Sequence, residues 1–524
     1  MKHWFLRLLA LALALFTVTS LVACGGGNGT SGSKPVSDSS SGSESGSESE
    51  SEEDKWASVN FGGEELKVEV SANQDSEVTF PPADLYTRGP DSLNEDPVQK
   101  KVYDRNLTVA TTLGLSIVFS ETDLAYSGVL EDMQKKVQMG SADAPDIYIN
   151  DAYGLARAMM NNLLVNVVNP VKPDGTPEDS YFDFAHDCWY QDYMLGMTFS
   201  PEKQYVLAGD YDLDLIRMAW VYYVNLDLLD ENLAGAGYDR EYVYEMVRQR
   251  AWDYETMMYL SETAHKDSVN SGTTDKDDEV VGMTWPHVFA FCFTPSSGLE
   301  VMQLDENGRP YVPDTNAGLF VLAEKLKAMY NTPGVYWEND VLKSTVNFMN
   351  GNIIFAMSVL GEMESEDMRN LPFAKGVIPF PIFDFTYQKE YNTITHDQSE
   401  VTSILNTTDR FTEASAYLQL INELSATVLH EYYENTLKLR YNDDPDCRDI
   451  IDIVHDTIAS PRPMVFVSAM YTATPLPEGV SDVTTYIKNQ AMNNTTSFSS
   501  DYEGARDAWE HCFQSGYDIF MGLD

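Results

Sequence analysis

The sequence predicts an α/β protein built as two lobes, and three observations lead to that expectation. The chain has 524 residues, and setting aside the first 58 leaves a body of 466, which is too long for one hydrophobic core. Hydrophobic residues make up 43% of the chain and aromatic residues 12%, as expected for a well-packed globular body. Strand and helix patterns alternate from residue 65 onward, which is typical of a parallel α/β sheet.

The first elements of the body follow one another in that alternating order. Residues 65–70 alternate between apolar and polar side chains, which predicts a strand. Asp96 and Pro97 suit the N-cap and first turn of a helix that Gly114 can close. Hydrophobic spacing then indicates a strand at 115–119, a helix from 130 to about 140, a strand at 146–150 and, later, a core helix at 411–428.

The N-terminus has the pattern of an export signal. Two basic residues precede an apolar run at 8–16 that is too short to span a bilayer as a helix. The segment 21–24, Leu-Val-Ala-Cys, then places a small residue directly before a cysteine. This resembles a bacterial lipoprotein signal, in which residues 1–23 are removed and Cys24 carries the lipid. The alternative is an ordinary secretory signal with an incidental cysteine.

Residues 24–58 have the composition of a flexible tether. Between Gly25 and Asp54 the chain is almost entirely Gly, Ser, Glu and Asp, with no aromatic residue. Such a segment cannot bury enough apolar surface to offset its ordering entropy, so we expect it to be disordered. A flexible chain of about 30 residues reaches roughly 30 Å. The expected location is therefore the extracellular face of the bacterial cytoplasmic membrane, with the body held to it by the lipid anchor alone.

The charge of the chain excludes one large class of partners. The formal net charge is −48, from 34 basic and 82 acidic residues. Affinity for phosphates needs a basic surface, so nucleic acid is excluded as a partner. Contact between the body and anionic lipids is disfavoured for the same reason.

The cysteines indicate neither a metal site nor a redox site. If Cys24 carries lipid, four others remain, and none forms a CxxC pair: Cys188, Cys292, Cys447 and Cys512. A large body does not need disulfides, so we expect buried free thiols. The four cysteines allow three disulfide pairings, and their spacing does not choose among them. The sequence predicts no metal and no cofactor.

Short motifs occur in a characteristic order along the body. They are Val-Tyr-Asp-Arg-Asn at 102–106, Ala-Pro-Asp-Ile-Tyr at 144–148, Tyr-Tyr-Val-Asn-Leu-Asp-Leu-Leu at 222–229, Trp-Asp at 252–253, Phe-Met-Asn-Gly-Asn at 348–352 and Gly-Val-Ile-Pro-Phe-Pro at 376–381. In this order they resemble the extracellular solute-binding proteins (family 1) of ABC importers, closest to the maltose and multiple-sugar type. Leu226 stands where that family has a lysine, which is a surface change.

The resemblance implies a periplasmic-binding-protein-like fold of type II, with two α/β lobes, a hinge of crossing strands, a ligand cleft between the lobes and C-terminal helices. Mapped onto this chain, lobe one comprises residues 59–208 and 379–427, and lobe two comprises residues 209–378 and 428–524. It also implies a monomer that captures a solute, a mono- or oligosaccharide by preference, and delivers it to the permease subunits of an ABC transporter.

The candidate ligand-binding residues combine aromatic rings, which cover the C–H faces of a sugar, with polar groups that bond its hydroxyls. Asp151 and Tyr153 follow the strand at 146–150, at the strand end where ligands gather in α/β sheets. The other candidates lie near the expected crossings or in neighbouring loops: Trp189, Tyr190, Asp210, Asp212, Trp285 and Glu362. Two alternatives stay open, in which Asp151 is only an N-cap and Trp285 belongs to the core.

A secreted cell-surface enzyme acting on glycosides is the competing class. It would need two carboxylates flanking a bond, but with 82 acidic residues candidate pairs carry no information. The sequence has no Gly-x-Ser-x-Gly, His-Glu-x-x-His or Walker motif. We therefore expect a binding protein and not an enzyme.

Overall fold

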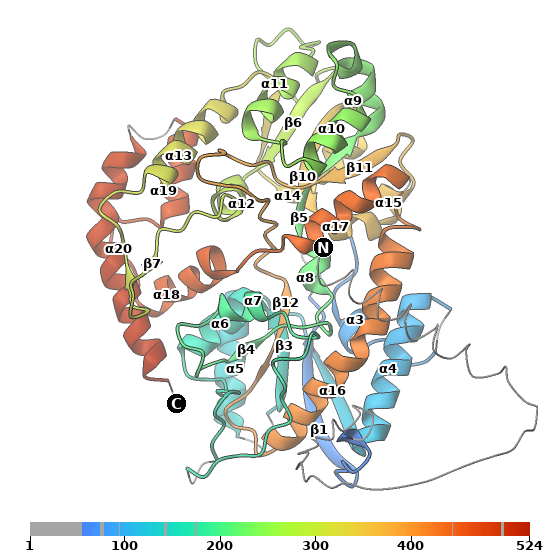
Figure 1. Ribbon diagram of the computed structural model, residues 1–524, viewed down its shortest axis with the longest axis vertical. Helices are drawn as coiled ribbons and strands as arrows, with labels where there is room; N and C mark the ends of the chain where they lie inside the picture. The colour runs from blue at the N-terminus through green and yellow to red at the C-terminus, as the bar shows by residue number, and fades with distance from the viewer. Residues whose placement is uncertain are drawn as a thin grey trace, which may run out of the picture. The chain divides into compact units, whose positions relative to one another are not determined.

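The computed structural model describes residues 55–523 except 74–77, 94, 141–143, 173–174, 443 and 494–496 (Figure 1). The expected signal at 1–23, Cys24 and the expected tether up to residue 54 lie outside the described residues. The last four residues assigned to the tether, 55–58, are packed on the body, where the buried Trp56 donates its indole N–H to Glu423 at 2.8 Å, so the expected disorder is wrong for them. Two five-stranded sheets form the centres of two lobes, with helices packed around them. The predicted two-lobed α/β architecture is therefore confirmed.

Lobe one is built on a sheet with the strand order β2-β1-β3-β12-β4. Strand β1 pairs in parallel with β2 and β3, whereas β12 pairs antiparallel with β3 and β4. The strands are β1 (Glu64–Ser71), β2 (Leu115–Thr122), β3 (Ile147–Asp151), β4 (Val206–Leu207) and β12 (Glu400–Ile404). The helices of this lobe are α3 (Asp84–Thr87), α4 (Pro97–Leu113), α5 (Ser127–Met139), α6 (Ala152–Met160), α7 (Gln191–Leu195) and α16 (Phe411–His430).

Lobe two is built on a sheet with the strand order β11-β5-β10-β6-β9. Its strands are β5 (Trp220–Asn225), β6 (Val281–Pro286), β9 (Val335–Glu338), β10 (Ile353–Val359) and β11 (Lys375–Ile378), and a small hairpin joins β7 (Gln303–Leu304) to β8 (Pro310–Tyr311). The helices between residues 214 and 369 are α8 (Asp214–Arg217), α9 (Leu226–Leu233), η1 (Ala234–Ala236), α10 (Arg240–Arg248), α11 (Tyr254–Ala264), α12 (Phe289–Ser296), α13 (Ala317–Tyr330), α14 (Val341–Met349), η2 (Leu360–Glu364) and α15 (Glu366–Arg369).

The C-terminal helices pack on both lobes. Helix α18 lies against α6 of lobe one, whereas α19 lies against α12 and α13 of lobe two, and α20 contacts both α6 and α13 (Figure 1). The sequence placed all of residues 428–524 with lobe two, and this contact pattern differs from that expectation. The helices are η3 (Glu431–Leu437), η4 (Pro445–Cys447), α17 (Arg448–Asp456), η5 (Arg462–Phe466), α18 (Val467–Ala473), α19 (Val483–Ala491) and α20 (Phe498–Met521).

Helix α4 begins and ends where the sequence predicts, for local chemical reasons. The Asp96 side chain accepts hydrogen bonds from the backbone N–H groups of Val98 and Gln99, each at 3.0 Å, and Pro97 opens the first turn. Gly114 ends the helix in the left-handed conformation, with φ 60°. Local cap chemistry thus accounts for both boundaries of this helix.

Two segments that connect the lobes run side by side. Ala219 forms a β-bridge with Thr395, and the Trp220 N–H donates to the Ile394 carbonyl at 2.9 Å. A third connection runs from α16 through η3 to α17 (Arg448–Asp456), which contacts β11 of lobe two. The expected hinge of crossing segments is thus present.

The return of the chain to lobe one comes later than the sequence predicted. Residues 379–427 were expected in lobe one, but the Ile382 N–H donates to the Trp252 carbonyl of lobe two at 3.0 Å. The chain joins the lobe-one sheet only at β12. The Pro-rich motif at 376–381 marks the end of a lobe-two strand and not the crossing itself, which explains the difference.

All four body cysteines are free and buried, as the sequence predicts: Cys188, Cys292, Cys447 and Cys512. Within the described part of the chain, no group of acidic, histidine or cysteine side chains is arranged to hold a metal ion. No helix in the described ranges has both the length and the apolar character needed to cross a membrane.

Candidate ligand-binding site

Two adjoining cavities lie where lobe one, lobe two and the C-terminal helices meet. Their volumes are about 500 and about 460 Å³, within the range of small-molecule sites. We call the two together the interlobe cleft, and five lining residues belong to both cavities: Tyr153 and Arg157 of α6, Phe291 of α12, Met464 of η5 and Ser468 of α18. Ligand in this cleft would touch both lobes and the C-terminal segment at once.

The lobe-one wall of the interlobe cleft is organised by Asp151. This residue ends β3 and caps α6, accepting hydrogen bonds from the backbone N–H groups of Gly154 at 2.5 Å and Tyr126 at 2.8 Å. Burial raises the pKa of Asp151 to about 7. The carboxyl group therefore positions both Tyr126, which precedes α5, and the first turn of α6, which carries Tyr153.

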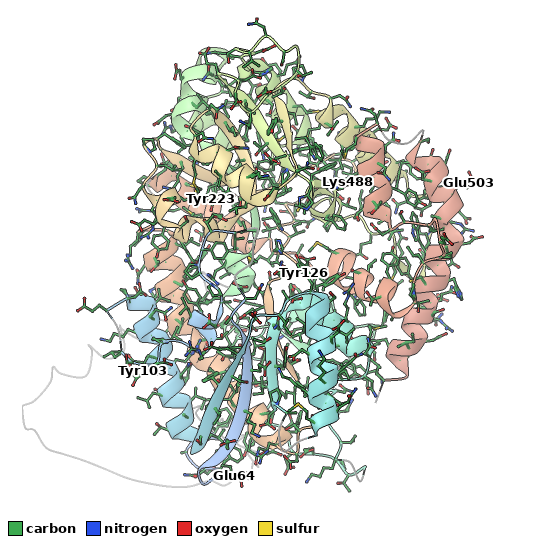
Figure 2. The ribbon with its side chains drawn as sticks, turned by 180° about the vertical axis from the view of Figure 1, so that it is seen from behind. Glu64, Tyr103, Tyr126, Tyr223, Lys488 and Glu503 are labelled. Carbon is green, nitrogen blue, oxygen red and sulfur yellow. The ribbon has the colours of Figure 1, made fainter. Side chains whose placement is uncertain are left out.

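Tyr126 adopts a backbone conformation that tyrosine rarely takes. Its φ is 51° and its ψ is −121°, and a non-glycine residue at positive φ typically costs about 1–3 kcal/mol. Figure 2 shows Tyr126 near the ends of the lobe-one strands, facing the interlobe region. The surrounding structure, including the bond to Asp151, offsets this strain. Backbone strain of this kind concentrates at ligand sites.

The aromatic rings of the lobe-one wall form a connected platform. Tyr126 and Tyr153 meet edge to face, with ring centroids 5.5 Å apart and an interplanar angle of 83°. The Arg157 guanidinium lies over the Tyr153 ring at 3.9 Å and donates a hydrogen bond to the Tyr153 hydroxyl. The Tyr126 hydroxyl donates to Asp397 at 3.3 Å. Rings and polar groups thus alternate along this wall, as a sugar requires.

The opposite wall is more apolar. Phe291 is 40% exposed and lies on α12 of lobe two. Tyr471 of α18 lines the same cavity, and Asp482 caps α19, accepting hydrogen bonds from the Thr485 N–H at 2.9 Å and from two threonine hydroxyls. The remaining lining residues on this side are Pro295, Val467, Thr472, Pro475, Leu476, Val480, Ser481, Val483 and Thr484.

Two of the sequence-predicted site residues belong to the interlobe cleft, one as a lining residue and the other as a buried support of the wall. Tyr153 lines both cavities. Asp151 is buried beneath the wall and acts as an N-cap, as in the alternative that the sequence left open, while also holding Tyr126.

Trp285 lies in the core of lobe two. It is fully buried and stacks on Phe289, with ring centroids 4.5 Å apart. Glu362 is also fully buried and accepts a hydrogen bond from the Thr79 N–H at 3.0 Å, as well as one from the Thr79 hydroxyl. Neither Trp285 nor Glu362 lines the described walls of the interlobe cleft. The sequence predicted Trp285 as a ligand contact because it stands beside polar residues. It lies in β6, whose residues are all buried, so its ring belongs to the core.

Four predicted residues lie in the lobe-one packing near the first connection. Trp189 is buried, and its indole N–H donates to Gln419 at 3.0 Å. Asp212 is buried and accepts hydrogen bonds from the Thr402 hydroxyl at 3.1 Å and the Gly209 N–H at 3.2 Å. Tyr190 and Asp210 lie beside one another in this region. The described lining of the cleft includes none of these four: Trp189, Tyr190, Asp210 and Asp212.

Sequence reasoning missed Tyr126, Arg157, Phe291, Asp397 and Tyr471. Arg157 could have been predicted from the sequence, because it follows Tyr153 by one helical turn and therefore lies on the same face of α6. For the others the sequence carries no local signal. Their approach depends on how distant segments fold back on one another.

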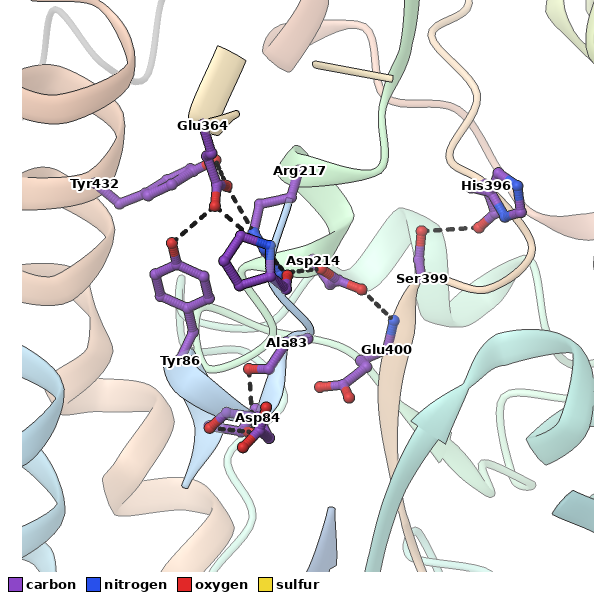
Figure 3. A network of polar contacts seen from close by, with 12 residues as sticks. Ala83, Asp84, Tyr86, Asp214, Arg217, Glu364, His396, Ser399, Glu400 and Tyr432 are labelled. Atoms are coloured by element: carbon purple, nitrogen blue, oxygen red, sulfur yellow. Dashed lines mark hydrogen bonds and ion pairs between the residues drawn. The ribbon is translucent and has the colours of Figure 1, made fainter. Parts of the chain in front are cut away.

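A buried network of charged and polar groups joins the lobes at the hinge (Figure 3). Arg217 of α8 is fully buried and donates to Glu364 at 2.8 and 3.2 Å and to Asp214 at 2.8 Å. The hydroxyls of Tyr86 and Tyr432 also donate to Glu364, at 3.0 and 2.7 Å. Because Tyr86 belongs to lobe one and Glu364 to lobe two, their hydrogen bond links the lobes directly.

Lobe one supplies two further groups to the same network. The Arg217 guanidinium donates to the Pro81 carbonyl at 2.6 Å, and the Glu400 N–H donates to Asp214 at 3.2 Å. The Glu400 carboxyl is buried beside Asp214, and this burial, together with that negative neighbour, raises its pKa well above the usual range. The hinge therefore holds more carboxyl groups than positive charge.

The body should be more stable at pH 5 than at pH 8. Burial raises the pKa of Asp212 to about 8 and that of Asp151 to about 7, so the folded state binds protons more tightly than the unfolded chain. This contribution is fully present below the unfolded pKa near 4 and is lost as pH rises through 7 to 8. Each group contributes at most about 1.4 kcal/mol per pH unit.

Urea denaturation at half-unit pH intervals measures this dependence. Asp212→Asn should flatten the slope between pH 5 and pH 8, because it removes one titrating group while keeping a side-chain oxygen acceptor. The exposed Asp314→Asn serves as the control, since Asp314 is 91% exposed. Unfolding free energy that rises from pH 5 to pH 8 would contradict the assignment.

Comparison with solved structures supports the sequence-based recognition of the fold. No protein-family model matches the chain, and no curated protein sequence matches it significantly. Solved structures nevertheless match over most of its length. The cyclic α-maltosyl-1,6-maltose binding protein of Arthrobacter globiformis has a TM-score of 0.52 and 13% identity, covering 88% of this chain and 100% of its own.

Two further structures match to the same degree. The GacH receptor of Streptomyces glaucescens GLA.O, solved unliganded and with acarbose, has a TM-score of 0.52 and 9% identity, covering 86% of this chain and 99% of its own. The galacto-N-biose-/lacto-N-biose I-binding protein of a Bifidobacterium longum ABC transporter has a TM-score of 0.52 and 10% identity, covering 87% and 98%. The chain therefore has the two-lobed fold of these sugar-binding proteins.

Proposed function

We propose that this chain is a lipid-anchored extracellular solute-binding protein that captures a carbohydrate in the interlobe cleft and delivers it to an ABC transporter permease. The observation that carries the proposal is the platform of Tyr126, Tyr153 and Arg157, set in a cleft lined by both lobes. The fold shared with three sugar-binding proteins supports the ligand class.

A ligand held by both lobes shifts the hinge equilibrium by its differential affinity for the closed form. Tyr153 and Arg157 on lobe one and Phe291 on lobe two would each gain contacts as the cleft closes around a sugar. The closed form then presents both lobes to the permease in one fixed arrangement. This sequence of events requires no covalent step, so the ligand should leave unchanged.

Binding by the tether-free body to a panel of mono- and oligosaccharides tests the proposal. A saccharide present at 100 times its dissociation constant should add about 2.7 kcal/mol of stability. Tyr153→Ala should weaken binding by roughly 1–3 kcal/mol, because it removes the stacking face and the support for Arg157, while melting changes little.

The matched control for that variant is Tyr259→Ala. Tyr259 is 49% exposed on α11, and its ring lies 5.6 Å from that of Tyr238, close to the 5.5 Å between Tyr153 and Tyr126. Its removal should leave affinity unchanged. Equal affinity of wild type and Tyr153→Ala for the best saccharide would place the ligand elsewhere.

The features of the cleft favour binding over glycoside hydrolysis. Its described lining contains two carboxylates, Asp397 and Asp482, and each already accepts hydrogen bonds from the protein. A hydrolase needs one carboxyl group to donate a proton and the other to attack or activate water. Incubating the pure protein with its best oligosaccharide should release no smaller sugar, and release of one would refute the proposal.

The anchor is proposed from the sequence at 21–24. Cys24→Ala should abolish lipid attachment, so the variant should remain uncleaved or be released from the membrane fraction. Mass spectrometry of the N-terminus together with cell fractionation measures this. Cys188→Ala, which removes a buried body cysteine, is the control and should fractionate with membranes like the wild type. Membrane fractionation and wild-type processing of Cys24→Ala would rule the anchor out.

A further inference from the structure

The charge inside the interlobe cleft differs from the charge of the chain as a whole. The chain carries 82 acidic and 34 basic residues, yet Arg157 projects from the lobe-one wall into both cavities. It is the one basic residue among the described lining residues. The position of this single positive charge in the cleft of so acidic a protein suggests a role in ligand binding.

Arg157 has no carboxylate partner within the described residues. Its guanidinium makes one hydrogen bond there, from Nη2 to the Tyr153 hydroxyl, and rests on the face of the same ring at 3.9 Å. Its Nε–H is buried without a partner. A guanidinium has five N–H donors, so most of its donor capacity is unused.

Other buried or half-buried arginines of the chain are paired differently. Arg217 bonds two carboxylates, and Arg240 bonds Asp227 and Asp230 at 3.0 and 2.5 Å. Arg105, which is also buried, has no carboxylate partner but donates to the Ser425 hydroxyl at 3.0 Å and to the backbone carbonyls of Tyr86 and Thr87. Arg157 has neither a carboxylate nor a backbone carbonyl as partner within the described residues.

The acidic residues of the cleft wall do not supply that partner. Asp482 is held by the N-terminus of α19 through the Thr485 N–H and two threonine hydroxyls. Asp397 accepts from the Tyr126 hydroxyl at 3.3 Å. Across the cleft, the Tyr471 hydroxyl is a second buried donor without a partner. Both unsatisfied groups, the Arg157 Nε–H and the Tyr471 hydroxyl, can donate a hydrogen bond, which suits a ligand rich in acceptors.

We infer that the carbohydrate taken by this cleft carries a carboxylate, as a uronic-acid oligosaccharide does, and that Arg157 pairs with it; this inference rests on the proposed function. A planar carboxylate matches the guanidinium fork and can bond two of its N–H groups at once. The Tyr126 and Tyr153 rings would then cover the sugar faces next to that carboxylate. A single monoanionic group balances the single positive charge, while Asp397 and Asp482 disfavour ligands with several charges.

Isothermal titration of the tether-free body with matched ligand pairs tests this inference. The probes are disaccharides of galacturonate, glucuronate and mannuronate, each compared with its methyl ester, along with neutral disaccharides and a sulfated disaccharide. At least one free acid should bind about tenfold or more tightly than its ester. That preference should shrink as salt is raised from 20 to 500 mM.

Variants at position 157 separate charge from packing. Arg157→Gln should remove the preference for acid over ester while the melting temperature shows that the fold persists. Arg157→Lys should restore part of the preference, since it keeps the charge but not the fork. Arg462→Gln is the control, because Arg462 bonds backbone carbonyls of Leu195 and Thr198 outside the cleft lining.

The outcomes distinguish this inference from the proposed function. Tighter binding of neutral or sulfated sugars, or equal binding of acid and ester, overturns the carboxylate assignment and leaves carbohydrate capture standing. Absence of binding to every saccharide overturns both. An acid preference that survives in Arg157→Gln places the carboxylate elsewhere and overturns the role of Arg157.

Discussion

Replacing Arg217 by methionine will destabilise the body by about 3–5 kcal/mol. Arg217 is fully buried and is the positive partner of both Glu364 and Asp214. Methionine fills much of the volume but leaves two buried carboxylates without a compensating charge. Removing one member of a buried ion pair costs far more than the pair contributes over apolar residues. Urea denaturation at pH 7 measures the loss.

The matched control for Arg217→Met is Arg248→Met. Arg248 also forms an arginine–aspartate pair, with Asp449 at 2.6 Å, but its side chain is 30% exposed and that of Asp449 is 53% exposed. Water solvates both charges after the substitution, so the cost should stay below about 1 kcal/mol. Similar losses for the two variants would show that burial of the hinge network is not what makes it costly to break.

Trp285→Ala should cost about 3–5 kcal/mol of stability while leaving the ligand affinity of the folded protein unchanged. Trp285 is fully buried and packs on Phe289, Phe293 and Tyr330. Alanine leaves a cavity that the surrounding strands and helices cannot close completely. Thermal denaturation, with titration well below the melting temperature, separates stability from affinity.

Tyr153→Ala should have the opposite effect to Trp285→Ala on stability and on affinity. It should weaken ligand binding and change melting little, because Tyr153 lies on the cleft wall and not in the core. Loss of affinity in fully folded Trp285→Ala would show that Trp285 contributes to the site despite its burial.

The parts of the fold that depend on local chemistry could be predicted from the sequence. Alternation in β1 and the cap residues of α4 fix those elements within a few residues, and the order of strands and helices up to β3 follows from the same signals. The end of β3 was likewise a sound place to expect a site, because Tyr153 lines the interlobe cleft there.

The parts that depend on distant contacts could not be predicted. All six residues of β6 are buried, since β10 and β9 flank it and helices cover its faces. Trp285 therefore belongs to the core, although polar residues stand beside it in the sequence. Tyr126, which has a positive φ, donates its backbone N–H to Asp151, and Asp151 lies in a different element. Ser468 and Tyr471 reach the cleft only because α18 folds back onto α6.

The packing of α18 and α19 against different lobes also bears on how the protein is made. Helix α6 leaves the ribosome long before α18, which covers it, and α13 long before α19. Neither lobe can reach its final packing until the last segment of the chain has been synthesised. Because domains generally fold as units, we expect each lobe to complete its folding only after its C-terminal helices have been synthesised. For the export proposed above, such an order of events would let the chain cross the membrane before its native packing is complete.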